Sequence, residues 1–278
     1  MNKPIFELKN VTVLGNKNSS NVTKILNNLS LTINDGDFIT VIGTNGAGKS
    51  TLLNVISGAL AIDDGIILHN GRDITNLSEE EHTKFLSRVF QDPQLGTAPR
   101  MTVAENMLLA LKRGERRFLV PRKLKQNRER FLKLAKMMHN GLEECMDTFT
   151  GNLSGGQRQA LSFLMAILKK PDILLLDEHT AALDPHTSQS LLNATREIIS
   201  QDKITALMIT HHLEDALNYG NRLLVLKQGK IIADLDHNAK IKLTTDDLYR
   251  YFELIIINKS QSFSKITKLG LFNVKIIR

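Results

Sequence analysis

The amino-acid sequence predicts an α/β fold with a mainly parallel sheet, on the strength of three observations. Residues 38–42, 173–176 and 206–209 are short apolar runs, which are typical of strands covered on both faces. The first of these runs ends in a glycine-rich turn. Segments with helical start and stop signals separate the runs. Because strands that alternate with helices favour parallel pairing, we expect an α/β protein.

The strands and turns near the N-terminus follow from simple alternation. Residues 6–13 and 29–33 alternate apolar and polar side chains, as half-buried strands do. Residues 15–21 are rich in Gly, Asn and Ser and predict a turn or loop between these strands. A helix is expected at residues 49–57, directly after the glycine-rich turn.

Two later helices have recognisable starts. Ser78 with Glu81, and Ser154 with Gln157, have the spacing of capping boxes. The second of these helices is expected to run through the two lysines that precede Pro171, because positive charge suits a helix C-terminus and the residue before proline avoids helical geometry.

Length and composition exclude several classes of protein. A domain of 278 residues has enough chain for a complete core, and 42% hydrophobic with 23% charged residues is close to the soluble average. Disorder, a fibrous repeat and a membrane-embedded chain are therefore disfavoured. No apolar run approaches the ~18 residues that cross a bilayer. The first residues reach the acid Glu7 before any apolar core, so we expect no signal peptide there. Because Cys145 is also the single cysteine, we expect a cytosolic protein.

The net charge of +7 is unevenly distributed. Residues 112–136 hold eleven Lys and Arg against two Glu, and five more basic residues follow Glu253 with no further acid. Two local patches are weaker evidence for nucleic-acid binding than a basic face would be. We therefore expect no nucleic-acid partner, and the patches are interpreted as solvated or membrane-facing surface.

The glycine-rich turn matches the phosphate-binding pattern G-x-x-x-x-G-K-[ST] between a strand and a helix. Its backbone N–H groups can surround phosphate oxygens, and the helix N-terminus adds positive charge. Lys49 is expected to reach the β- and γ-phosphates, and the Ser50 hydroxyl to ligate Mg²⁺. The complete candidate loop is Gly43, Thr44, Asn45, Gly46, Ala47, Gly48, Lys49, Ser50 and Thr51.

A second half of the site follows residues 173–176, where an apolar strand ends in Asp177 and Glu178. Open α/β sheets bind ligands at the carboxyl ends of their strands, so both carboxylates are expected beside the phosphate loop. Asp177 is predicted to hold Mg²⁺, and Glu178 to orient the attacking water near the γ-phosphate. Acids often end buried strands, and it is the pairing with a phosphate loop that makes this signal strong.

Residues Leu153-Ser154-Gly155-Gly156-Gln157 stand after the phosphate loop and shortly before the Asp177 strand. In this context the sequence resembles the nucleotide-binding subunits of ABC transporters, over about residues 4–252. A helix start with two glycines makes a second anion site. In the family, two subunits face head to tail, and the Ser154, Gly155, Gly156 and Gln157 positions bind the partner's ATP, so the resemblance implies a homodimer.

The resemblance also implies an architecture and domain boundaries. The fold is that of a phosphate-loop NTPase (RecA-like) core, with an N-terminal antiparallel β subdomain and an inserted α-helical subdomain at about residues 92–168. Within that insert, Phe131, Leu132, Leu134, Ala135 and Met138 are spaced for one helix face. We expect residues 1–253 to form the ATPase domain and residues 254–278 a basic C-terminal extension.

Three further residues match family positions singly. Gln91 resembles the glutamine that touches Mg²⁺ and transmits movement to the membrane partner. Asp184 resembles the aspartate that lies across the dimer, and His211 resembles the histidine that contacts the γ-phosphate. Glu178, His211 and Gln91 are thus the candidate catalytic residues, and Ser50, Gln91 and Asp177 the candidate metal residues. Taken alone, each has a plainer interpretation, such as Asp184 as a cap before Pro185.

Two features depart from the family. It usually stacks adenine on an aromatic residue after the first strand, but residues 7–37 contain no aromatic. Our hypothesis is that Leu14 or Val22 covers the base, with poor discrimination between ATP and GTP. His179 stands where the family most often has proline, and a packing role is preferred over a catalytic one.

Residues 177–180, 90–99 and 114–117 resemble one bacterial subfamily. Its members usually accompany a periplasmic-type binding protein and a permease of the branched-chain amino-acid or sugar type, and some are associated with aromatic amino acids. This implies an importer at the cytoplasmic face of the membrane. The alternatives are an exporter subunit and a soluble ABC ATPase, although the latter generally carries two cassettes or a long coiled coil. A non-hydrolysing nucleotide binder is disfavoured by the presence of Glu178 and His211.

Overall fold

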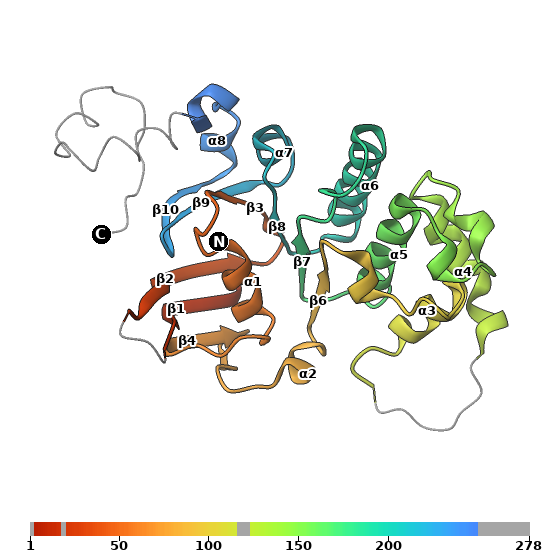
Figure 1. The fold of residues 1–278 in the computed structure, drawn as a ribbon, viewed down its shortest axis with the longest axis horizontal. Coiled ribbons are helices and arrows are strands. Elements are labelled where there is room, and N and C mark those ends of the chain that lie inside the picture. Colours follow the sequence, from red (N-terminus) through yellow and green to blue (C-terminus); the bar gives the residue numbers. More distant parts are fainter. Residues whose placement is uncertain (1–2, 18–20, 116–122, 250–278) are drawn as a thin grey trace.

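The computed structural model describes residues 3–17, 21–115 and 123–249, which form two sheets with helices around them (Figure 1). One sheet has four strands in the order β2-β1-β4-β5, and the other has six in the order β10-β9-β3-β8-β7-β6. The proposed extension at residues 254–278, and Arg116 and Arg117 of the basic stretch, lie outside the described residues. In the part of the chain that is described, no helix is both long and apolar enough to cross a membrane.

The four-stranded sheet is antiparallel and contains the strands expected near the N-terminus. Its strands are β1 (Pro4–Gly15), β2 (Thr23–Asn34), β4 (Asp64–His69) and β5 (Arg72–Asp73). The alternation expected at residues 6–13 is confirmed, but β1 continues to Gly15, which pairs with Thr23. Gly15, which was expected in the turn, is therefore the last residue of β1, and the connection to β2 spans residues 16–22, of which 18–20 lie outside the described residues.

The six-stranded sheet is parallel except for its last strand. The parallel strands β6, β7, β8, β3 and β9 pair in this spatial order, and β10 pairs antiparallel with β9. The three apolar runs of the sequence are all strands of this sheet. The bounds are β3 (Phe38–Gly43), β6 (Leu86–Val89), β7 (Ile173–Asp177), β8 (Ala206–Ile209), β9 (Arg222–Lys227) and β10 (Lys230–Leu235).

Helices cover both faces of this sheet. The α-helices are α1 (Lys49–Ile56), α2 (Glu79–His82), α3 (Val103–Leu111), α4 (Leu124–Lys136), α5 (Gly155–Ile167), α6 (Pro185–Asp202), α7 (Leu213–Asn218) and α8 (His237–Lys240). Short 3₁₀ helices are η1 (Pro93–Gly96), η2 (Leu142–Cys145) and η3 (Thr150–Asn152).

The side chains of β7 show how the two faces differ. Ile173 and Leu175 pack in a core with residues of α1 and the four-stranded sheet. Leu174 and Leu176 pack in a second core with residues of α3, α4, α5 and α6. The phosphate-loop helix α1 and helix α5 therefore lie on opposite sides of the six-stranded sheet, as Figure 1 also shows. The predicted α/β fold, with an antiparallel β part and a helical part, is confirmed.

Both predicted capping boxes are present, at Ser78 and at Ser154. However, α5 ends at Ile167 and not at the lysines before Pro171. The carbonyls at and just beyond this helix end are bound by arginines: Arg113 donates to the carbonyls of Ala166 and Lys169 at 2.8 and 2.6 Å. Arg130 donates to the carbonyl of Leu168 at 2.8 Å. Positive charge does compensate this helix end, but it comes from other elements.

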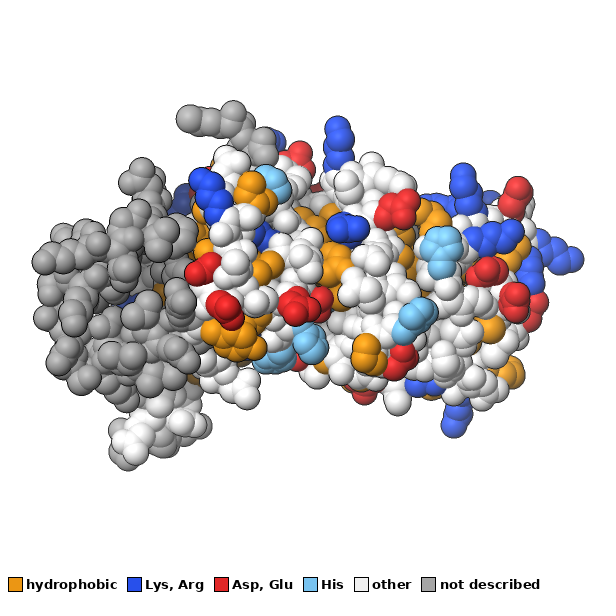
Figure 2. Space-filling view, turned by 90° about the horizontal axis from the view of Figure 1, so that it is seen from above, with side chains coloured by type: hydrophobic (Ala, Val, Ile, Leu, Met, Phe, Trp, Pro, Cys, Tyr) orange, Lys and Arg blue, Asp and Glu red, His pale blue; other side chains and the backbone are white. Residues whose placement is uncertain are grey.

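The basic stretch is thus partly structural. Besides those two arginines, Arg128 makes two hydrogen bonds to the carboxylate of Asp147, at 2.7 and 2.5 Å. Blue side chains still gather at the end of the molecule formed by α4, with acidic ones among them (Figure 2). The interpretation as wholly solvated or membrane-facing surface was therefore too simple. Within the expected helix face, Phe131 and Ala135 are buried, and Met138 is buried beyond the end of α4.

Candidate active site

The residues singled out in the sequence meet at one edge of the six-stranded sheet. Gly43 ends β3, Gln91 follows β6, Asp177 ends β7 and His211 follows β8. These strands are parallel neighbours, so their carboxyl ends lie along the same edge, where open α/β sheets bind ligands. Topology therefore brings together residues that lie up to 168 positions apart, from Gly43 to His211 (211 − 43).

The phosphate loop is held from outside by the turn between β9 and β10. The N–H of Gly229 donates to the carbonyl of Ala47 at 3.0 Å, and the carbonyl of Gly229 accepts from Asn27 of β2 at 3.0 Å. Gly48 caps α1 with φ +100°, and a Cβ there would lie 3.0 Å from the carbonyl oxygen of Ile25. Only glycine tolerates this combination of left-handed backbone and close approach.

The Lys49 ammonium is folded back over the loop. Lys49 is only 6% exposed, and its Nζ donates to the carbonyls of Gly43 at 2.8 Å and Thr44 at 3.3 Å. Burial lowers the pKa of Lys49, and the negative charge of Glu178 partly opposes this shift. The loop therefore presents a positive charge at its mouth, with Thr44, Asn45 and Gly46 exposed around it.

Glu178 and His211 form a close pair. Nε2 of His211 lies 2.6 Å from Oε1 of Glu178, whose side chain is 12% exposed against 46% for the histidine. Glu178 has φ +45°, an uncommon conformation for a residue with a side chain. Its N–H donates to the carbonyl of Ile209 at 3.2 Å, which helps to hold this geometry. A carboxylate fixed in this way can accept a proton from water, as a general base does.

Asp177 is paired with an arginine that the sequence analysis missed. Nη2 of Arg88 lies 2.5 Å from Oδ2 of Asp177, and both side chains are 14% exposed. The available signal was a single charged residue inside the short apolar strand at residues 86–89. Charged residues are almost never buried unless they are paired, so Arg88 called for a partner.

The candidate metal residues offer oxygen ligands only. Ser50 contributes a hydroxyl, Asp177 a carboxylate and Gln91 an amide oxygen, and Ser50 and Gln91 are both exposed at the same sheet edge. Mg²⁺ prefers oxygen ligands and usually binds through one or two protein groups together with substrate phosphates. The donor set therefore fits Mg²⁺.

The start of α5 has the expected cap. Ser154 Oγ accepts from the N–H of Gln157 at 3.2 Å, and Gln157 Oε1 accepts from the N–H of Ser154 at 3.2 Å. Gly155 and Gly156 form the first turn, and a Cβ on Gly156 would lie 2.5 Å from Cγ2 of Thr187. The N-termini of α5 and α6 are therefore in close contact at this point.

Asp184 begins α6, as the plainer interpretation of this residue expected. Its Oδ1 accepts from the N–H of Thr187 at 3.0 Å, and the hydrogen bonds to Thr187 lower the pKa of the carboxyl. His179 is 2% exposed, and burial lowers its pKa to about 4. This neutral, enclosed imidazole agrees with the packing role that we preferred. His212, next to His211, is exposed.

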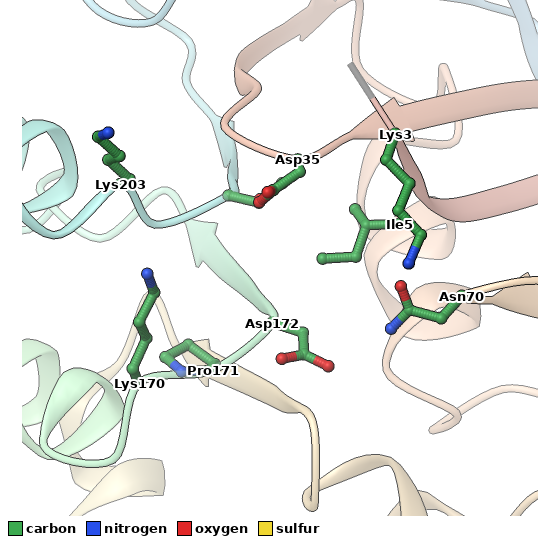
Figure 3. A pocket seen from close by; sticks show the side chains of 9 residues that line it. Lys3, Ile5, Asp35, Asn70, Lys170, Pro171, Asp172 and Lys203 are labelled. Atoms are coloured by element: carbon green, nitrogen blue, oxygen red, sulfur yellow. The ribbon is translucent and has the colours of Figure 1, made fainter. Parts of the chain in front are cut away.

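A pocket of about 340 Å³ lies at the opposite edge of the sheet (Figure 3). Its residues precede the strands: Asp35 comes before β3, Asp172 before β7 and Thr205 before β8. Lys3 and Asn70 extend toward each other on one side of it. None of the candidate site residues lines this pocket, so it takes no part in the arrangement described above.

A phosphate loop, a strand ending in Asp-Glu and a histidine at one sheet edge define a phosphate-loop nucleoside triphosphatase. The ABC transporter family matches residues 26–181 of the chain. The tyrosine transport ATP-binding protein of Clostridioides difficile is 45% identical over 84% of this chain and 92% of that protein. The chain belongs to the ABC transporter family, and it is an ATP-binding and ATP-hydrolysing subunit.

Other relatives agree with this assignment. The spermidine/putrescine import ATP-binding protein PotA of Haemophilus influenzae is 35% identical over 84% of the chain, which spans 58% of PotA. The phosphonates import ATP-binding protein PhnC of Lactococcus lactis is 34% identical over 83% of the chain and 94% of PhnC. The ATP-binding cassette MJ0796, solved as a dimer in a post-hydrolysis state with ADP and Pi, superposes with a TM-score of 0.72 at 28% identity over 84% of this chain and 99% of that cassette.

Proposed function

We propose that this subunit powers the import of an amino acid, with an aromatic amino acid such as tyrosine as the leading candidate. The observation that carries the proposal is the 45% identity to the C. difficile tyrosine transport protein over 92% of its length. PotA and PhnC, which are also import proteins by name, are less similar to this chain. The relatives that support import therefore outweigh the exporter and soluble-ATPase alternatives.

In the proposed site, residues 43–51 bind the ATP phosphates, and Lys49 faces the β- and γ-phosphates. Mg²⁺ is held by Ser50, Gln91 and Asp177, where it would neutralise phosphate charge. Glu178 takes the proton of the attacking water through its carboxylate, and His211, whose Nε2 lies 2.6 Å from that carboxylate, orients it. The deeper burial of Glu178 suits the role of base.

The active form is proposed to be a dimer with two ATP molecules. Helices α1 and α5 cover opposite faces of the sheet, which supports a role for the Ser154–Gln157 turn at the ATP of a second copy. The capped start of α5 carries unpaired N–H groups and partial positive charge, both suited to the γ-phosphate. Asp184 adjoins this turn through Thr187 and is proposed to cross the same interface.

The remaining components of the system follow from the subfamily resemblance. The dimer is proposed to lie at the cytoplasmic face of the membrane on two permease subunits of the branched-chain amino-acid or sugar type. A substrate-binding protein delivers the amino acid to the opposite side. The ATPase domain is proposed to occupy residues 1–253, with the helical part at about residues 92–168.

Uptake in cells tests the proposal. Cells lacking this gene are complemented with the wild-type chain or with Glu178→Gln, and uptake of radiolabelled tyrosine, spermidine and a phosphonate is compared. We expect the wild-type chain alone to restore tyrosine uptake and to leave the other two unchanged. Restored spermidine or phosphonate uptake, with no change for tyrosine, would overturn the amino-acid assignment.

A further inference from the structure

Arg88 is a charged residue in an otherwise apolar setting. It lies in β6, opposite Leu175 of β7 in the parallel register, between the buried residues Ser87 and Val89. Its side chain is 14% exposed. Removing a guanidinium from water to this degree is costly unless it is paired, so its partners indicate why it is there.

Three elements surround the guanidinium. Nη2 donates to Oδ2 of Asp177 at 2.5 Å, and Nη1 donates to Oδ1 of Asn54 at 2.7 Å. The Phe90 ring lies across its face, with Cζ 5.0 Å from the ring centroid. Asn54 is on α1, one turn after Ser50, and Phe90 precedes Gln91. Arg88 therefore contacts the elements that carry all three candidate metal residues.

This placement has an electrostatic consequence. Without a cation, the Asp177 carboxylate would present an uncompensated negative charge to the phosphates of a bound nucleotide. Arg88 supplies a fixed positive charge to this carboxylate through one of its two oxygens. A cation such as Mg²⁺ that binds the same carboxylate is repelled by the positive charge of Arg88. At such distances this repulsion changes the affinity for the cation severalfold.

We propose that Arg88 is a positioning residue that acts as a built-in counter-cation for Asp177 and reduces the dependence of nucleotide binding on Mg²⁺. The inference rests on the proposed nucleotide site. Arg88 and Mg²⁺ are antagonists in this arrangement, because each compensates the same carboxylate. Removing the Arg88 charge weakens metal-free nucleotide binding and strengthens the contribution of Mg²⁺. Both effects raise the ratio of the nucleotide Kd without Mg²⁺ to the Kd with Mg²⁺.

The test measures ATP affinity of the full-length chain in excess EDTA and in excess Mg²⁺, with a fluorescent N-methylanthraniloyl ATP as the probe. The quantity compared is the ratio of the Kd in EDTA to the Kd in Mg²⁺. Arg88→Gln and Arg88→Met both remove the charge, and Gln keeps hydrogen-bonding capacity. We expect the ratio to rise about tenfold in both variants.

Two matched variants keep the charge. Arg88→Lys retains a cation beside Asp177, and Asn54→Ala removes only the second anchor of the guanidinium. We expect both ratios to stay within about threefold of wild type. Thermal unfolding identifies which variants are folded, and either neutral variant is sufficient for the comparison.

An unchanged or lower ratio of the Kd in EDTA to the Kd in Mg²⁺ in a folded neutral variant would overturn the inference. Arg88 would then be a structural residue that links β6 to α1. Such a link affects stability but does not act on the Mg²⁺ dependence. Failure of the proposed nucleotide site is a different result, because the wild-type chain would then bind no probe in either buffer.

Discussion

Replacing Glu178 by glutamine is expected to separate ATP binding from hydrolysis. The side chains have the same shape, and the amide oxygen of glutamine can take the place of Oε1, which lies 2.6 Å from Nε2 of His211. The variant is therefore expected to fold and to bind ATP as the wild type does. What is lost is the basicity of the carboxylate.

The magnitude follows from this role. General-base catalysis contributes about 10²- to 10⁴-fold, so the rate of ATP hydrolysis should fall by this factor. The loss corresponds to about 3 to 5.5 kcal/mol of transition-state stabilisation. Phosphate release measures turnover, and the same fluorescent nucleotide measures binding. The active form is proposed to be a dimer that holds two ATP molecules, and hydrolysis would consume them. A stable ATP-bound dimer of Glu178→Gln should therefore accumulate in size-exclusion chromatography.

Glu197→Gln is the matched control, because Glu197 is an exposed acid toward the C-terminal end of α6, whereas the candidate residue Asp184 caps the N-terminus of that helix. It should hydrolyse ATP at the wild-type rate. If Glu178→Gln keeps a rate within about tenfold of wild type, the carboxylate does not act as general base and the reasoning from its geometry is refuted.

Four further predictions follow from the structure. His211→Ala should lower turnover at least about tenfold while the Kd for ATP changes little, since it removes the group that orients Glu178; equal losses in both would contradict this role. Gly156→Ala should impair ATP-dependent dimerisation and lower thermal stability by about 1–3 kcal/mol, because the new methyl group meets Thr187, and Thr187→Ser should partly rescue it. Burial lowers the pKa of Lys240 from 10.5 to about 7, so between these pH values the unfolded chain binds a proton that the folded chain does not, and the free energy of unfolding should rise with pH. Urea unfolding should show this rise for wild type and a smaller one for Lys240→Met, and identical slopes would contradict it. Finally, the Kd values for ATP and GTP should lie within about tenfold of each other, because no aromatic residue is available in residues 7–37 to stack on adenine; a strong preference for ATP would refute this hypothesis.

Several of the strands and helices could be predicted from the sequence because local signals define them. The apolar run 173–176 and the glycine-rich turn at residues 43–51 each carry their own evidence for strand, turn and neighbouring helix. Ser154 and Gln157 cap their helix through a contact that spans three residues. Signals between residues that are close in sequence can be recognised from the sequence itself. The fold class and the candidate residues could therefore be assigned without the structure.

The partners of charged side chains could not be predicted in this way. Arg88 finds Asp177 89 residues away, and Arg113 finds the end of α5 53 and 56 residues away. Such pairs depend on which strands become neighbours, and the spacing of residues along the chain does not encode that. The basic stretch was misjudged for this reason, since counting charges does not reveal which of them point inward.

The hydrogen bond between Gly229 and Ala47 joins two segments of the chain that are synthesised at different times. The proposed phosphate loop is translated early, but the residue that supports it follows 182 residues later (229 − 47). A nascent chain that ends before the hairpin of β9 and β10 contains the whole phosphate-loop sequence but lacks the hydrogen bond from Gly229 that supports it. The proposed phosphate loop therefore gains this support only after residue 229 has been synthesised.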